Sequence, residues 1–132
     1  MKTLPAEVRA DLYDLAAIAA EAVLEFGSSA AVVVPTDSGR MARSIARFRL
    51  PVWTAGVTRS EAVARQLHLS YGVHPVLHPA PVADWSAFTR EWVAAHGLQG
   101  TMAVLLRGPS PEPGRANHAM ELIDLVPGAI GP

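Results

Sequence analysis

The stretch of sequence that decides the fold reads Val32-Val33-Val34-Pro35-Thr36-Asp37-Ser38-Gly39-Arg40-Met41-Ala42. Its apolar start predicts a strand over residues 30–34 that is buried on both faces, because a strand with one solvent face would alternate apolar and polar residues. The hydroxyl residues and the glycine predict a turn, and residues 40–48 have the pattern of a helix. A buried strand that leads at once into a helix is typical of a parallel α/β sheet.

Segments on both sides of this stretch continue the alternation of strands and helices. Apolar residues recur at helical spacing over residues 6–26, which predicts an amphipathic helix. Pro75 cannot donate a ladder hydrogen bond, so the strand over residues 73–77 is expected at an edge of the sheet. Together the segments predict a three-layer α/β/α sandwich around a mostly parallel sheet. Further strands are expected at residues 50–57, 102–106 and 118–125, and further helices at residues 61–67, capped by Ser60, and from 84 or 85 to 96.

Length and composition narrow the class of protein. The chain has 132 residues, which fits one domain of about 100–150 residues and excludes a (β/α)₈ barrel of roughly 250. We expect a single domain over residues 1–132, with its core at about 6–126 and a loose tail at 127–132. A net charge of −1 provides no positive electrostatic potential that would attract a nucleic acid or an anionic membrane. With no Cys and no targeting signal, the expected compartment is the cytoplasm.

The turn after the first strand has the chemistry of a phosphate site. Thr36 and Ser38 offer hydroxyl groups, Gly39 lets the backbone come close to a ligand, and Arg40 can neutralise an anion. Free N–H groups at the start of the helix would add to this attraction. A plain helix cap with an exposed arginine explains the same residues. The spacing matches neither a Walker loop nor a dinucleotide fingerprint, which require more glycines.

The same turn carries a resemblance to a known family. Thr36-Asp37-Ser38-Gly39-Arg40-Met41-Ala42, with the arginine-rich helix after it, resembles the C-terminal domain of pyruvate kinase. The likeness continues in order over roughly residues 10–126, so it covers nearly the whole chain. Its later blocks are Leu50 to Arg59, Ala64 to Leu69, Gly72 to Leu77, Gly97-Leu98, Ala103 to Leu106, Gly108 and Pro113 to Asn117.

The resemblance implies a fold and a ligand. The implied sheet has five strands in the order 3-2-1-4-5, with the last strand antiparallel. In pyruvate kinases the crevice between strands one and four takes a phosphorylated sugar or nucleotide effector, here between the loops at residues 36–40 and 108–117. Met41 stands where the family has Ser or Thr, and Ala116 where it has Thr, so weak affinity is expected. The implied effector-binding residues are Thr36, Ser38, Gly39, Arg40, Met41, Gly114, Arg115, Asn117, Trp85 and Arg90.

The resemblance also implies what this chain does not do. Pyruvate kinases transfer the phosphoryl group in a barrel domain that holds Mg²⁺ and K⁺, so no catalytic residue, metal or cofactor is expected here. Two hypotheses of different class follow. The chain is either a regulatory domain that binds a phosphorylated effector, or a free-standing assembly module with a vestigial phosphate site. A homo-oligomer is expected in either case, and a pyruvate kinase barrel domain is a further partner consistent with the resemblance.

Three other patterns in the sequence bear on possible sites and on the core. The run Arg40, Arg43, Arg47 and Arg49 is either an anion-binding face, or a solvated helix face or subunit contact. His74 and His78 are spaced like a metal pair, but in an extended chain they would be about 13 Å apart, too far for one ion. Trp53 and Trp92 are expected in the core.

Overall fold

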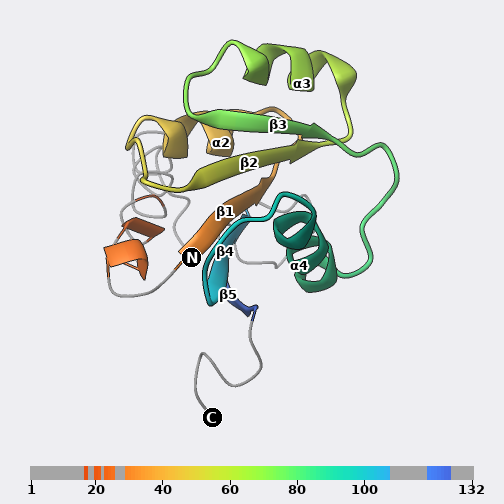
Figure 1. Ribbon diagram of the computed structural model, residues 1–132. Coiled ribbons are helices and arrows are strands. Elements are labelled where there is room, and N and C mark those ends of the chain that lie inside the picture. The colour runs from red at the N-terminus through yellow and green to blue at the C-terminus, as the bar shows by residue number, and fades with distance from the viewer. Residues whose placement is uncertain (1–16, 18–19, 22, 26–28, 108–118, 126–132) are drawn as a thin grey trace, which may run out of the picture.

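A single mixed sheet organises the chain (Figure 1). The computed structural model describes residues 17, 20–21, 23–25, 29–107 and 119–125. The strand order is β3-β2-β1-β4-β5, in which β4 and β5 are antiparallel and the other pairs are parallel. This is the order and direction expected from the sequence. The strands are β1 (Ser29–Pro35), β2 (Trp53–Thr58), β3 (Val73–Leu77), β4 (Met102–Arg107) and β5 (Ala119–Asp124).

Helices cover both faces of this sheet. α2 (Arg40–Ala46) and α3 (Glu61–His68) lie on one face, and α4 (Trp85–Ala95) lies on the other (Figure 1). Ala17 and Ala20, from the helix expected at residues 6–26, are helical and fully buried on the α2 face. The layers are therefore those of the predicted α/β/α sandwich.

The side chains of β1 divide between two apolar cores. Val32 and Val34 pack with the buried face of α2, whereas Val33 packs with α4. All three valines are fully buried, which confirms the prediction of a strand covered on both faces. Because β1 is the central strand, its carboxyl end is held firmly on both sides, and the turn that follows starts from a fixed point.

Close approach of α2 and α3 to β2 depends on one glycine. A Cβ atom added to Gly56 would lie 2.9 Å from Leu67 Cδ1 and 3.3 Å from Ala42 Cβ. A side chain at this position would therefore require Leu67 and its neighbours to shift.

Most predicted boundaries hold to within two residues, and one is wrong. Ser60 caps α3 by accepting a 3.3 Å hydrogen bond from the Val63 N–H, as predicted. Pro75 lies in the edge strand β3. The second strand, expected at residues 50–57, begins only at Trp53, after a bend at Pro51 and Val52.

Trp53 itself corrects the expectation of a core residue. Its side chain is 51% exposed. α4 packs mainly over β1, β4 and β5, so it leaves the start of β2 uncovered on that face. Trp92 is buried, as predicted. Across the described part of the chain, no helix has the length and apolar character needed to cross a membrane.

Candidate functional site

The turn after β1 is held by its own hydrogen bonds. The Thr36 N–H donates to the Val57 carbonyl oxygen at 2.8 Å, which ties the turn to β2. Thr36 Oγ1 accepts from the Gly39 N–H at 2.7 Å, and Ser38 Oγ accepts from the Arg40 N–H at 3.3 Å. Each hydroxyl accepts with its oxygen, so its own hydrogen can still be donated to a ligand.

Gly39 allows the sharp change of direction from the turn into α2. Its φ of 83° lies in the left-handed region, which other residues adopt at a cost. An added Cβ atom would lie 3.0 Å from the Arg43 guanidinium and 3.1 Å from Leu67 Cδ2. Gly39 is buried, and the absence of a side chain lets the turn pack closely against α3.

The predicted residues of the turn differ in how far their side chains are exposed to solvent. Ser38 and Arg40 are exposed, and Thr36 is half-buried. Met41 is only 3% exposed, because its side chain packs in the core beside α2. Met41 can therefore offer a ligand only its main chain, in line with the loss of a hydroxyl noted in the sequence.

The turn lies at the point in the sheet where the direction in which successive strands are added reverses. β1 is paired with β2 on one side and with β4 on the other. From the end of β1 the chain continues through α2 into β2. Val33 is paired with Leu105, so the end of β4 at Arg107 lies level with Pro35. In open α/β sheets such a switch point is the usual position of a ligand crevice.

The second wall of the predicted crevice lies outside the described residues. Gly114, Arg115 and Asn117 belong to the segment between β4 and β5, of which residues 108–118 are not described. Their role in binding stays a prediction. The described end of β4, at Arg107, lies beside the end of β1, from which the turn starts.

The structure separates the two predicted residues of α4. Trp85 begins α4, which follows the carboxyl end of β3 after the connection at residues 78–84 and leads back to the start of β4. Its ring centroid lies 5.2 Å from that of Phe88. Trp85 therefore lies at the same edge of the sheet as the turn. Arg90 donates from Nε to the Asp124 carbonyl oxygen at 2.9 Å. Asp124 is paired with Met102, the first residue of β4, so Arg90 reaches the opposite edge.

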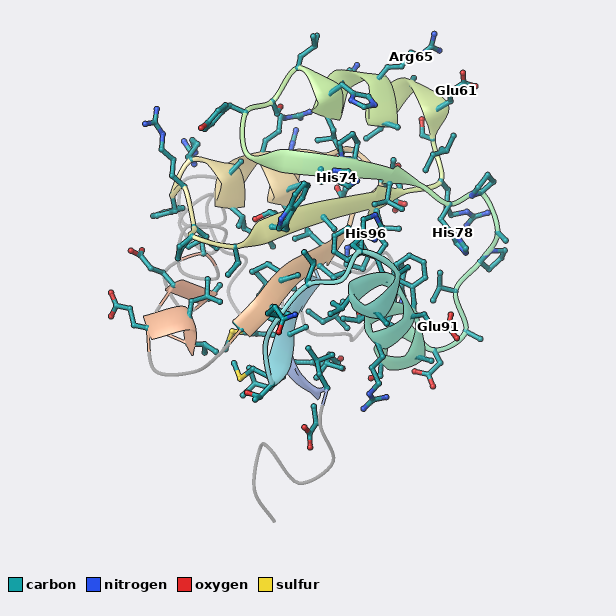
Figure 2. All side chains as sticks on the ribbon, viewed as in Figure 1. Glu61, Arg65, His74, His78, Glu91 and His96 are labelled. Atoms are coloured by element: carbon teal, nitrogen blue, oxygen red, sulfur yellow. The ribbon has the colours of Figure 1, made fainter. Side chains whose placement is uncertain are left out.

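A second group of side chains lies at the amino-terminal edge of the sheet, and sequence reasoning missed it. The His74 ring centroid is 5.1 Å from that of Trp53, 5.9 Å from that of Trp92 and 5.7 Å from that of His96. His74 lies on β3, and His96 follows α4 (Figure 2). We call these four side chains the aromatic cluster. Its members come from three separate elements, so no short motif in the sequence indicates that they lie together.

Burial sets the electrostatics of the aromatic cluster. It lowers the pKa of His74 below the ordinary 6.5, and the nearby His96 and His68 lower it further. A neutral His74 is therefore favoured near pH 7. His78 contacts Phe88 instead, with ring centroids 5.1 Å apart. Among the described residues, no three His, Asp or Glu side chains are grouped so that they could hold a metal ion.

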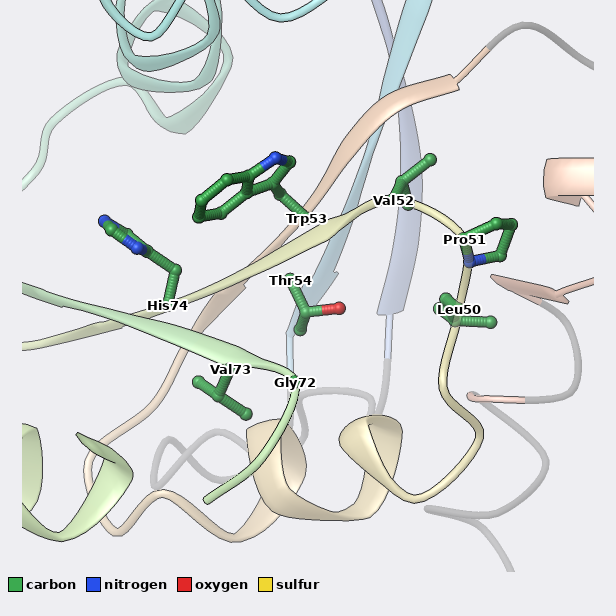
Figure 3. Close-up of a pocket in the computed structure, with 8 residues that line it drawn as sticks. All are labelled: Leu50, Pro51, Val52, Trp53, Thr54, Gly72, Val73 and His74. Carbon is green, nitrogen blue, oxygen red and sulfur yellow. The ribbon is translucent and has the colours of Figure 1, made fainter. Parts of the chain in front are cut away.

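A hollow of about 400 Å³ opens beside the aromatic cluster (Figure 3). Trp53 and His74 form one side of it, and the remaining lining is mostly apolar. Among the described residues, its lining includes no arginine or lysine for a phosphate, in contrast to the turn after β1. The lining residues are Leu50, Pro51, Val52, Trp53, Thr54, Gly72, Val73 and His74.

Comparisons with known proteins match most of the chain. A family model described as "Pyruvate kinase, alpha/beta domain" matches residues 14–120. The chain is similar to pyruvate kinase PKLR of Rattus norvegicus, with 42% identity over 59 residues, which are 44% of this chain and 10% of the rat protein. The same figures hold for pyruvate kinase PKLR of Homo sapiens. Similarity to the pyruvate kinase of Clostridium acetobutylicum is 37% over 67 residues, 51% of this chain and 14% of that protein. The chain thus spans between 10% and 14% of the length of these relatives.

Proposed function

Since the chain belongs to the family of the pyruvate kinase alpha/beta domain, we propose that it is a regulatory, non-catalytic domain that binds a phosphorylated sugar or nucleotide. The ligand would lie in the crevice between the turn after β1 and the segment after β4. The turn would hold a phosphate group through the Thr36 and Ser38 hydroxyls and the main chain near Gly39. Trp85 would line the crevice from α4.

The observation that carries this proposal is the ordered turn at the switch point of the sheet. Its shape is fixed by the Thr36 Oγ1 to Gly39 hydrogen bond and by the tie to β2, so little ordering would remain when a ligand binds. Ser38 and Arg40 are exposed there and Thr36 is half-buried, and contacts between such groups and a phosphate are charge-assisted. Ligand binding at this position also suits the topology.

Catalysis by this chain alone is not expected. Its 132 residues cannot include a barrel of roughly 250, and phosphoryl transfer relies on positioned cations that spread the phosphoryl charge. A coupled assay with phosphoenolpyruvate, ADP, Mg²⁺ and K⁺ should therefore read background. Turnover above that of an Arg40→Ala variant would contradict the non-catalytic part of the proposal.

Titration calorimetry tests the binding part. Fructose 1,6-bisphosphate, ribose 5-phosphate, glucose 6-phosphate and AMP are titrated into the chain and into a Thr36→Val/Ser38→Ala variant. We expect one of the four to bind at submillimolar concentration, and the variant to bind it roughly a hundredfold or more weakly, because two hydrogen bonds to a charged group are lost and each is worth about 1.5–3 kcal/mol.

A matched control removes a hydroxyl elsewhere. Thr101 is exposed just before β4, at the opposite edge of the sheet, so Thr101→Val should leave the affinity unchanged. If none of the four ligands binds below millimolar concentration, or if Thr36→Val/Ser38→Ala changes nothing, the crevice is not an effector site.

One observation favours the assembly module as a second candidate. β5 lies at an edge of the sheet, and its Met120 and Leu122 side chains are exposed on one face. An edge strand with exposed apolar side chains is a ready pairing surface for another copy of the chain. Sedimentation at micromolar concentration should show a dimer that Met120→Glu/Leu122→Glu converts to a monomer. A monomer in the unchanged chain would remove the support for this candidate.

A further inference from the structure

Three aromatic rings lie in a row at the carboxyl edge of the sheet. The Phe88 ring of α4 is the central one, and its centroid is 5.1 Å from that of His78 and 5.2 Å from that of Trp85. His78 belongs to the connection that leads from β3 to α4 (Figure 2). We call these three side chains the ring row. Both contacts are edge-to-face, with interplanar angles of 72° and 69°, so these neighbouring rings do not stack flat against each other.

The ring row is only partly covered by the rest of the protein. Each of its three side chains is half-buried, whereas Trp92 and Val93, further along α4, are buried. Part of the row therefore faces solvent beyond the ends of the strands. Such an aromatic surface can hold a nucleic-acid base, because every base has a π-face that stacks on aromatic side chains.

The end of β2 fixes the spacing between the ring row and the turn after β1. The Thr36 N–H donates to the Val57 carbonyl oxygen, and the His78 N–H donates to the Thr58 carbonyl oxygen, both at 2.8 Å. Val57 is paired with β1 and Thr58 with β3, so Thr36 and His78 flank β2 on opposite sides. Their backbones are two strand spacings apart, which is roughly 10 Å.

We propose that the ligand of this edge is a nucleoside monophosphate, with its phosphate at the turn and its base against the ring row. The phosphate contact is that of the proposed function, on which this assignment rests, and the base contact is new. A sugar phosphate has no flat apolar group that the ring row could hold. In a nucleotide the ribose separates the phosphate from the base, as β2 separates the turn from the ring row. Rings that served packing alone would give no preference between the two kinds of ligand.

Calorimetry with AMP, ribose 5-phosphate and adenosine tests the assignment. AMP should bind roughly tenfold or more tightly than ribose 5-phosphate, because stacking of the base adds to the phosphate contact. Adenosine, which lacks the phosphate, should also bind more weakly than AMP.

Two variants remove rings from the row. His78→Ala and Phe88→Leu should each weaken AMP binding roughly fivefold and leave ribose 5-phosphate binding unchanged. The first keeps the N–H that donates to Thr58, and the second keeps an apolar side chain where α4 packs on the sheet. His68→Ala is the matched control, since His68 is an exposed histidine at the end of α3, from which the chain leads to the start of β3. It should leave both affinities unchanged.

The spectrum of His78 provides a readout that does not depend on affinity. Its ring proton signals should move when AMP is added and stay in place with ribose 5-phosphate, because only AMP brings an aromatic base beside them. Equal affinities for AMP and ribose 5-phosphate, both lowered by Thr36→Val/Ser38→Ala and neither by His78→Ala, would overturn the nucleotide assignment and leave the proposed function standing. No binding of either ligand would overturn both. A loss in His68→Ala equal to that in His78→Ala would also contradict the assignment.

Discussion

The two edges of the sheet carry groups of side chains that are assembled in opposite ways. At the carboxyl edge, Thr36 to Arg40 form a polar turn whose side-chain hydrogen bonds lie within five consecutive residues. At the amino edge, the aromatic cluster brings together Trp53, His74, Trp92 and His96 from three distant segments. Local hydrogen bonds shape the first group and tertiary packing shapes the second. The two edges should therefore respond differently to substitution, to pH and to ligands.

The largest expected effect falls on the aromatic cluster. Trp92 is buried between β3 and its own helix and contacts both His74 and His96. Replacing it with alanine should lower the free energy of unfolding by about 3 kcal/mol, because a large cavity would open in the core. Trp53→Ala is the matched control, and its cost should be about 1 kcal/mol, since half of that side chain already faces water. Urea unfolding of both variants measures the difference. Equal costs would mean that the two tryptophans do not differ as their burial indicates.

Substitution of Gly39 tests how closely the turn at the carboxyl edge is packed. Gly39→Ala should lower the free energy of unfolding by about 2 kcal/mol, because it adds a side chain at a left-handed φ and against Leu67. Gly97 has a similar φ of 62° but nothing within 4 Å of an added Cβ atom. Gly97→Ala should therefore cost about 1 kcal/mol, the backbone contribution alone. If Gly39→Ala were no more costly than Gly97→Ala, the close packing under the turn would not matter.

A smaller effect is expected from pH at the aromatic cluster. The folded-state pKa of His74 is below its ordinary 6.5 through burial, His96 and His68. As the pH falls through about 6.5, the unfolded chain takes up the proton more readily than the folded one, so stability decreases. The unchanged chain should therefore lose more stability between pH 7.5 and pH 5 than His74→Phe, which keeps a ring at this position. Equal losses in the two proteins would assign the pH dependence to other groups.

Contiguous features of the molecule could be predicted from the sequence. The valine run of β1 indicates a strand buried on both faces, and the hydroxyl residues with Gly39 indicate a turn. Each signal lies within a few residues. The strand order and the direction of β5 came from the family resemblance, which the match over residues 14–120 confirms. In the candidate site, Thr36, Gly39 and Trp85 lie at the expected edge of the sheet.

Features that depend on which helix covers which strand could not be predicted. Trp53 follows apolar residues and so was expected in the core, but α4 does not cover the start of β2. The family resemblance implies that Arg90 lies in the crevice, yet its Nε donates to the Asp124 carbonyl oxygen at the other edge.

The most direct test of the central claim follows both edges at once. In the ¹⁵N-labelled chain, the backbone amides of Ser38 to Met41 report on the turn after β1, and the indole N–H groups of Trp53 and Trp92 report on the aromatic cluster. Titration with the phosphorylated sugar or nucleotide that binds best should shift the amide signals of the turn and the Trp85 indole signal. The Trp53 and Trp92 signals should stay in place. Shifts at Trp53 and Trp92 with none at Ser38 to Met41 would contradict the assignment of the ligand to the carboxyl edge.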